Sequence, residues 1–211
     1  MTETSASPPE TPGTRREPST RRRQSASRTQ DIALIGVFAA LMAVLNFAPP
    51  IPLNFGVPIT LGTLGVGLAG LILGPWRGAA AMALYVVLGL VGLPIFAGFT
   101  GGLGVMAGPT AGYILSWPVA GFFTGLFGLI VIRHAPRRWW VPMFTVTAFL
   151  AGLLSYRLLG IPGMALNLEI SLTEAFFIDL AFWPGDAVKA LVAALIAVLI
   201  HRAFPTVLVR R

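Results

Sequence analysis

The stretch GAAAMALYVVLGLVGLPIFAGFTGGLGVMAGPTAGYILSWPVAGFFTGLFGLIVI, residues 78–132, runs for 55 residues without a charged side chain. A second uncharged run covers residues 32–76. A helix needs roughly 20 largely apolar residues to cross a bilayer. Each run is therefore long enough for more than one crossing. We predict an all-α fold, an integral membrane bundle that passes through the membrane several times.

The composition of the whole chain agrees with this class. Only 11% of its 211 residues are charged, whereas soluble proteins carry about 25%. The chain contains no cysteine, which excludes thiol catalysis, disulfides and cysteine-ligated metals. Its two histidines, His134 and His201, each stand beside an arginine at the end of an apolar run and show no metal-binding spacing. We therefore expect no metal site.

Three regions differ in composition. Residues 1–30 are rich in Ser, Thr, Pro and Arg and contain no aromatic residue. Such a segment cannot bury enough apolar surface to offset its ordering entropy, so we predict a disordered basic tail in the cytoplasm. Residues 31–204 form the predicted six-helix transmembrane domain. Residues 205–211 form a short basic C-terminal tail.

Six spans account for the apolar segments of this domain. The second and third are short for a crossing, and Pro118 is expected to kink the fourth. The predicted spans are at about residues 31–48, 59–73, 79–91, 110–132, 139–159 and 185–203.

The basic residues predict the orientation. With the N-terminus inside and the spans alternating, all arginines except Arg157 fall on the inner face, and Lys189 falls outside. Cytoplasmic loops of membrane proteins carry an excess of Lys and Arg. An odd number of spans would not give this distribution of basic residues. Both termini are therefore predicted to be cytoplasmic. The protein is predicted to be a multi-pass protein of the cell membrane.

The outer connections, at about residues 49–58, 93–113 and 161–185, are long and unusually apolar, and the first two are rich in Gly and Pro. Irregular apolar backbone is tolerated at membrane depth where it is buried in protein or lines a cavity, and such interruptions often mark substrate sites in transporters. The alternative is that the glycines only permit tight turns. In the third connection, Ser171 and Glu174 match a capping box and predict a short helix.

Asp186 and Lys189 lie in the first turn of the last predicted span. A carboxylate is favoured at a helix N-terminus, but a cation is disfavoured there. Ionisable residues near membrane depth suggest a functional site. We hypothesise that the pair offers an acceptor and a donor to a small polar solute, with Tyr85, Phe96, Tyr113 and Trp183 as walls. Alternatively, Lys189 snorkels outward or only neutralises Asp186.

Five motifs now suggest a family. They are VPIT (57–60), LGPWRG (73–78), YVVLGLVGLPIFAG (85–98), GPTAGY (108–113) and PGDAVK (184–189). In this order and spacing the chain resembles the BioY family over about residues 31–204. These proteins are the substrate-binding (S) components of energy-coupling factor (ECF) vitamin transporters for biotin. One departure is Gly62, where many members carry glutamine.

The resemblance implies a site and a role. Asp186 and Lys189 would belong to the biotin site near the outer face, and Tyr85, Phe96 and Tyr113 would form its walls. The outer loop would close over the ligand by means of its glycines, Gly98, Gly101 and Gly102. The chain would bind biotin without catalysing a reaction and without a cofactor. It contains no GxxxxGK[ST] motif, so no nucleotide site is expected.

The resemblance also implies partners. A transmembrane coupling protein and two cytoplasmic ATPases would supply the energy for delivery inward. Small residues on the first span allow close helix approach in lipid, and the candidates for docking are two pairs, Ala39 with Ala43 and Gly36 with Ala40. The alternative is that these residues pack within the bundle.

Three other functions remain open. The chain could be an S component for another vitamin, or a self-sufficient channel or carrier. An intramembrane enzyme would need a nucleophile and base or clustered carboxylates on facing helices, and the outer acidic residues lie near no serine–histidine pair.

Overall fold

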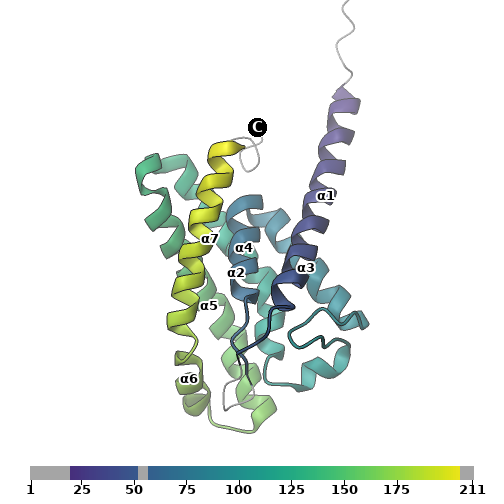
Figure 1. The fold of residues 1–211 in the computed structure, drawn as a ribbon, viewed down its shortest axis with the longest axis vertical. Coiled ribbons are helices and arrows are strands. Elements are labelled where there is room, and N and C mark those ends of the chain that lie inside the picture. Colours follow the sequence, from purple (N-terminus) through teal and green to yellow (C-terminus); the bar gives the residue numbers. More distant parts are fainter. Residues whose placement is uncertain (1–19, 52–56, 205–211) are drawn as a thin grey trace, which may run out of the picture.

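The computed structural model describes residues 20–51 and 57–204, with side chains from residue 28 onward. Within these residues the fold is helical, and no strand longer than an isolated bridge occurs (Figure 1). The α-helices are α1 (Thr20–Asn46), α2 (Gly62–Leu73), α3 (Pro75–Val91), α4 (Ala111–His134), α5 (Trp140–Leu168), α6 (Leu172–Leu180) and α7 (Trp183–Ala203), and the 3-10 helices are η1 (Leu103–Ala107) and η2 (Arg137–Trp139).

Each of the six predicted spans corresponds to a helix. Four helices are long and apolar enough to cross a membrane, and α2 and α3 are shorter apolar helices. Pro118 lies inside α4. The predicted short helix is α6, where the Ser171 hydroxyl accepts from the Glu174 amide and the Glu174 carboxylate accepts from the Ser171 amide.

The first helix starts earlier than predicted. Helix α1 begins at Thr20, so residues 20–30 are helical and their prediction as a disordered tail is wrong. The segment from Thr20 to Ile35 contains neither proline nor glycine, and a helix already formed by the apolar residues that follow propagates at one hydrogen bond per residue. The rest of the predicted tail, residues 1–19, and the C-terminal tail, residues 205–211, lie outside the described residues.

The fifth helix ends later than predicted. Helix α5 continues past residue 159 and through Pro162, and it stops at Glu169 with a left-handed φ of 55°. A Cβ on Gly163 would lie 2.9 Å from the Cα of Gly112 in α4. The helix therefore continues because these glycines let the backbones of α4 and α5 pack closely, which offsets the hydrogen bond lost at the proline.

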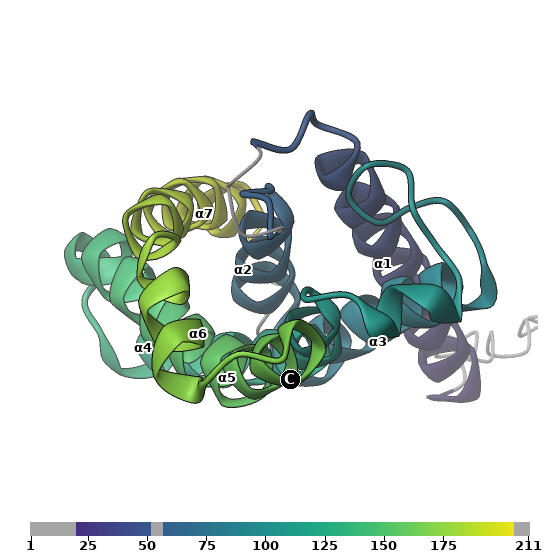
Figure 2. The ribbon, with the colours of Figure 1, turned by 90° about the horizontal axis from the view of Figure 1, so that it is seen from below.

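Helix α2 is at the centre of the bundle. It contacts α1, α3, α4, α5 and α7, and Figure 2 shows it between α7 and α1. Ten of its residues are buried. A helix of 12 residues is only about 18 Å long, too short for a bilayer core of about 30 Å. Because protein surrounds it, its ends need not reach the lipid interface.

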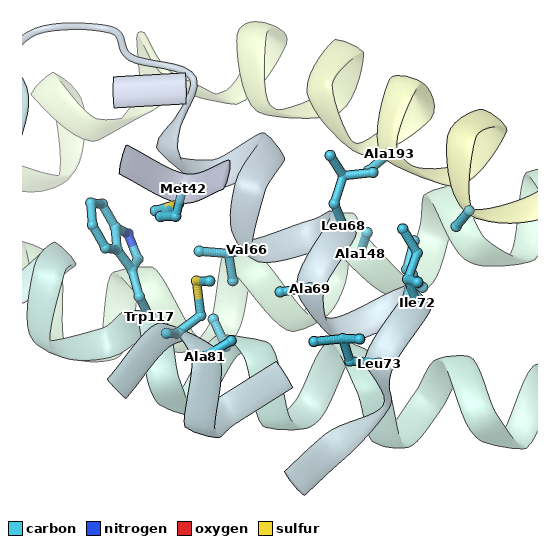
Figure 3. Packing of buried hydrophobic residues seen from close by; sticks show 14 of the residues in the cluster. Met42, Val66, Leu68, Ala69, Ile72, Leu73, Ala81, Trp117, Ala148 and Ala193 are labelled. Carbon is cyan, nitrogen blue, oxygen red and sulfur yellow. The ribbon is translucent and has the colours of Figure 1, made fainter. Parts of the chain in front are cut away.

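The core around α2 combines small and branched side chains with larger ones such as Met42 and Trp117. Val66, Ala69 and Leu71 are fully buried, and Ala193 of α7 and Met42 of α1 pack in the same cluster (Figure 3). Small residues allow close helix contacts where the hydrophobic effect between helices is weak.

The two ends of the bundle differ. The start of α1 and the end of α7 lie at one end, whereas α6 and the loops that join α1 to α2 and α3 to α4 lie at the other (Figure 1). We call the latter the loop end. Both long irregular connections therefore lie on the same side of the molecule, where the candidate site is found.

Candidate ligand-binding cavity

A cavity of about 330 Å³ lies at the loop end. Its walls come from α1, α2, α4, α5, α6 and α7 and from the two irregular connections. The lining residues are Asn46, Val57, Pro58, Thr60, Thr63, Phe96, Ala97, Thr100, Val105, Pro109, Thr110, Tyr113, Ile114, Trp117, Tyr156, Arg157, Asp179, Phe182, Asp186 and Lys189. The wall is mostly apolar, with a group of charged side chains among its members, as in most small-molecule sites.

The predicted acid–base pair lies in this wall. Nζ of Lys189 is 3.3 Å from Oδ1 of Asp186, and both side chains are 12% exposed. The hydroxyl of Thr63, on α2, donates to Asp186 over 3.0 Å and accepts from Lys189 over 3.1 Å. Because α7 begins at Trp183, Lys189 lies in its second turn, where the helix dipole is weaker, and its ammonium is neutralised locally.

A second acid and base complete the group. Arg157 of α5 donates from Nε to Oδ2 of Asp179 over 2.6 Å and from Nη2 to Oδ2 of Asp186 over 3.3 Å. Asp179 of α6 is fully buried and also accepts from the hydroxyl of Tyr113 at 2.8 Å and the indole N–H of Trp183 at 2.9 Å. The guanidinium carbon of Arg157 lies 5.1 Å from the centre of the Trp183 ring.

We call Thr63, Arg157, Asp179, Asp186 and Lys189 the charged cluster. Its two carboxylates and two cations give a net charge of zero. Buried charges are tolerated when they are paired and their remaining polar atoms are hydrogen-bonded, and both conditions hold here. The cluster connects α2, α5, α6 and α7, so it fixes the position of four helices around the cavity.

The predicted aromatic walls divide into two groups. Phe96 and Tyr113 line the cavity, whereas Tyr85 and Trp183 do not. Tyr85 is fully buried behind Phe96, with its ring 5.5 Å from that of Phe96 and 5.6 Å from that of Trp117. Its hydroxyl donates to the carbonyl of Ile95 over 2.6 Å. Tyr85 therefore holds the outer loop in position and does not face the ligand space.

The predicted loop glycines shape the backbone. Gly98 and Gly102 have φ values of 71° and 86°, a conformation that glycine adopts without steric cost. A Cβ on Gly101 would overlap the carbonyl of Leu93. These glycines do not line the cavity; they allow the turn that brings Phe96 and Thr100 together in an isolated bridge.

Several residues of the site were not predicted, among them four polar ones. Thr63, Arg157 and Asp179 belong to the charged cluster, and Asn46 lines the cavity from α1. The signal for Arg157 was present, because it is the single charged residue between residues 139 and 168 and intramembrane charge suggests function. Thr63 and Asn46 carry no such signal, because isolated polar residues occur in many membrane helices.

The candidate docking residues on α1 face two directions. Ala39 is 5% exposed in the core, and Ala43 packs against the same core. That pair therefore packs within the bundle and does not lie on a free face. Ala40 is exposed, and a Cβ on Gly36 would meet no atom within 4 Å. The pair of Gly36 and Ala40 lies on the outward face.

Within residues 20–51 and 57–204 no group of three or more His, Asp or Glu side chains is arranged to hold a metal ion. His201 is buried and its Nε2 lies 2.8 Å from the carbonyl of Leu71, next to Trp140 and Phe144. Its role is to join α7 to α2 at the end of the bundle away from the cavity.

Known proteins are similar to this chain in sequence. A family model described as the BioY family matches residues 18–206. The chain is 44% identical to the biotin transporter BioY of Rhodobacter capsulatus, with 86% of this chain and 98% of that protein covered. It is 40% identical to a probable biotin transporter BioY of Bacillus subtilis, over 82% of this chain and 91% of that one.

A solved structure is also similar. It is the crystal structure at 2.1 Å of an S-component for biotin from an ECF-type ABC transporter. The TM-score is 0.77 and the sequence identity is 27%, with 84% of this chain and 93% of that chain covered.

Proposed function

Because this chain belongs to the BioY family, we propose that it is the biotin-binding S component of an energy-coupling factor transporter. It is a multi-pass membrane protein and not an enzyme. The observation that carries the proposal is the cavity at the loop end, which combines a mostly apolar wall with the charged cluster. Relatives named as biotin transporters and the biotin S-component of similar fold support the choice of ligand.

The chemistry of the cavity suits biotin. Biotin has a ureido ring with two N–H donors and one oxygen, an apolar thioether ring, and an aliphatic tail that ends in a carboxylate. Phe96, Tyr113, Trp117 and Ile114 provide apolar surface for the rings and the tail. A lysine has three N–H donors, and Lys189 directs two of them to Thr63 and Asp186. Its third donor is suited to an oxygen of the ligand.

The orientation is part of the proposal. The six helices α1, α2, α3, α4, α5 and α7 would form the domain embedded in the cell membrane, with both termini in the cytoplasm. The distribution of basic residues supports this, because Arg77, Arg133 and Arg202 all lie at the end of the bundle opposite the cavity. The cavity would then face the outside, where the vitamin is captured.

The transport partners follow from the same assignment. A transmembrane coupling protein and two cytoplasmic ATPase subunits would drive the delivery of biotin inward. The outward face of α1, with Gly36 and Ala40, would contact the coupling protein. Small residues at these positions let a second helix approach closely in lipid.

The test is direct binding. The chain purified in detergent is titrated calorimetrically with biotin and, in parallel, with riboflavin, thiamine and pantothenate. We expect sub-micromolar binding of biotin and of none of the other three. Tight binding of another vitamin with no binding of biotin would overturn the assignment.

The transport step needs a second assay. Uptake of radiolabelled biotin is compared in cells that express this chain alone and in cells that also express the coupling module. We expect the module to raise uptake. Equal uptake in the two strains would contradict the role as an S component and would favour a self-sufficient biotin carrier.

A further inference from the structure

Asn46 carries a buried acceptor that no donor satisfies. The residue is 1% exposed, and its Oδ1 is buried without a hydrogen-bond partner among the described residues. A buried polar atom of this kind costs free energy unless a ligand or water satisfies it. In the cavity wall, such an atom therefore marks a place where a partner is missing.

The orientation of the amide is determined by its other atom. Nδ2 of Asn46 donates to the carbonyl of Met42 over 3.0 Å. Exchanging the two atoms of the amide would place Oδ1 against that carbonyl, and two acceptors would then face each other. The bond to Met42 uses one of the two N–H donors of Asn46, and the amide oxygen therefore points away from that carbonyl.

The residue of α2 next to the Asn46 oxygen is a glycine, Gly62. A Cβ on Gly62 would lie 3.3 Å from Oδ1 of Asn46 and 3.1 Å from Cζ2 of Trp117. The glycine lets α2 approach both side chains and places no side chain of its own between them. Asn46 and Trp117 both line the cavity, so an aromatic surface and an acceptor lie next to each other in the wall formed by α1, α2 and α4.

The other strong acceptors of the cavity already have donors. Asp186 accepts from Thr63, Lys189 and Arg157. Asp179 accepts at both of its oxygens as well. Among the carboxylate and amide oxygens of the described lining residues, Oδ1 of Asn46 is thus the one without a donor.

From these contacts we infer that Oδ1 of Asn46 accepts a hydrogen bond from a ureido N–H of biotin. The inference rests on the proposed function. The ureido nitrogens are the only N–H donors of biotin, whereas its thioether offers none and its tail is a carboxylate at neutral pH. A donor on the ligand would satisfy the buried oxygen, and Asn46 would then select for a ligand that carries N–H at this position.

The experiment combines a variant with modified ligands. Wild-type protein and Asn46→Ala are titrated with biotin, with biotin methylated on either ureido nitrogen, and with biotin methyl ester, which alters only the tail. Thr145→Val is the matched control, because it also removes a side-chain hydrogen bond to the carbonyl four residues earlier but lies outside the cavity wall. Should Asn46→Ala not fold, Asn46→Leu, of similar shape, replaces it.

We expect Asn46→Ala to weaken biotin binding about tenfold or more, and Thr145→Val to leave it unchanged. For wild type, one of the two methylated derivatives should have a much lower affinity than biotin. For Asn46→Ala, the same derivative and biotin should have nearly equal affinities. Esterification of the tail should lower the affinity by the same factor in both proteins.

Equal affinity of Asn46→Ala and wild type for biotin would overturn the inference. So would an equal penalty for each methylated derivative in both proteins, because Asn46 would then be satisfied by water or act only in packing. Wild type that binds no biotin would refute the proposed function itself, a result distinguishable from these two.

Discussion

The Nε atom of Arg157 lies 2.6 Å from Oδ2 of Asp179, and the two side chains are only 9% and 1% exposed. This ion pair joins a membrane-spanning helix, α5, to the short helix α6 at the loop end. Arg157 also reaches Asp186. The pair therefore links α6 to the acid and base that line the cavity, and its removal is expected to affect the whole loop end.

Replacing Arg157 by methionine should destabilise the protein strongly. The substitution leaves Asp179 as an uncompensated buried carboxylate, which typically costs about 3–5 kcal/mol. The double variant with Asp179→Asn should recover part of this loss, because no buried charge then remains unpaired at that position. Thermal unfolding in detergent without ligand measures both. Equal stability of the single and double variants would show that the ion pair does not hold α6 in place.

Asp186→Asn and Lys189→Ala should each weaken biotin binding. Removing one partner of a desolvated charged pair costs about 2–5 kcal/mol, and calorimetric titration measures the change. The control is Asp31→Asn, which removes the ion pair with Arg77 at the opposite end of the bundle and should not change affinity. Two cluster variants that insert normally and bind like wild type would mean that the pair is structural.

Tyr85→Phe should loosen the outer loop without disturbing the aromatic packing. The ring contacts with Phe96 and Trp117 remain, but the Ile95 carbonyl loses a 2.6 Å hydrogen bond, which costs about 1–3 kcal/mol when the acceptor stays buried. We expect faster hydrogen exchange over residues 93–108 and faster dissociation of biotin. Trp140→Phe removes a comparable bond to Ala135 at the other end and should change neither. Unchanged exchange in Tyr85→Phe would exclude this supporting role.

Ala40→Phe should prevent assembly with the coupling protein but leave biotin binding intact. Ala40 lies on the outward face of α1, so a large side chain there blocks the close approach of another helix without entering the bundle. Co-purification of the coupling module on the tagged S component measures assembly. Leu199→Phe, at an exposed position on α7, is the control because it lies on another helix. Normal co-purification of Ala40→Phe would place the docking surface elsewhere.

The capping box of α6 should respond to acid. Hydrogen bonds from the backbone and the hydroxyl of Ser171 lower the pKa of the Glu174 carboxyl below its ordinary value. A group with a lowered folded-state pKa contributes stability above its unfolded pKa, and this contribution disappears as the pH falls through the folded pKa. The amide resonance of Ser171, followed by NMR from pH 7 downward, should shift in that acidic range. In Glu174→Gln the shift should be absent; its persistence would assign it to another group.

Parts of the site could be predicted because their chemistry is unusual in a membrane. Asp186 and Lys189 are conspicuous in an apolar sequence, and the structure places them together in the cavity wall. Tyr85 shows the limit of this approach. The residue type and the motif are consistent with a ligand wall, but only the packing shows that Phe96 lies between Tyr85 and the cavity. The same holds for Ala39, which is a small residue on the buried side of its helix.

The sequence by itself determined the class of protein and the positions of its helices. Apolar runs without charge must leave water, and in lipid their backbone hydrogen bonds must be satisfied within helices. These are local requirements that act along the chain. Tertiary structure alone decided which polar atoms meet. Arg157, Asp179 and Thr63 come from three different helices, and the amide oxygen of Asn46, on α1, lies beside Gly62 of α2. Such contacts depend on how helices cross in space, which local periodicity does not specify.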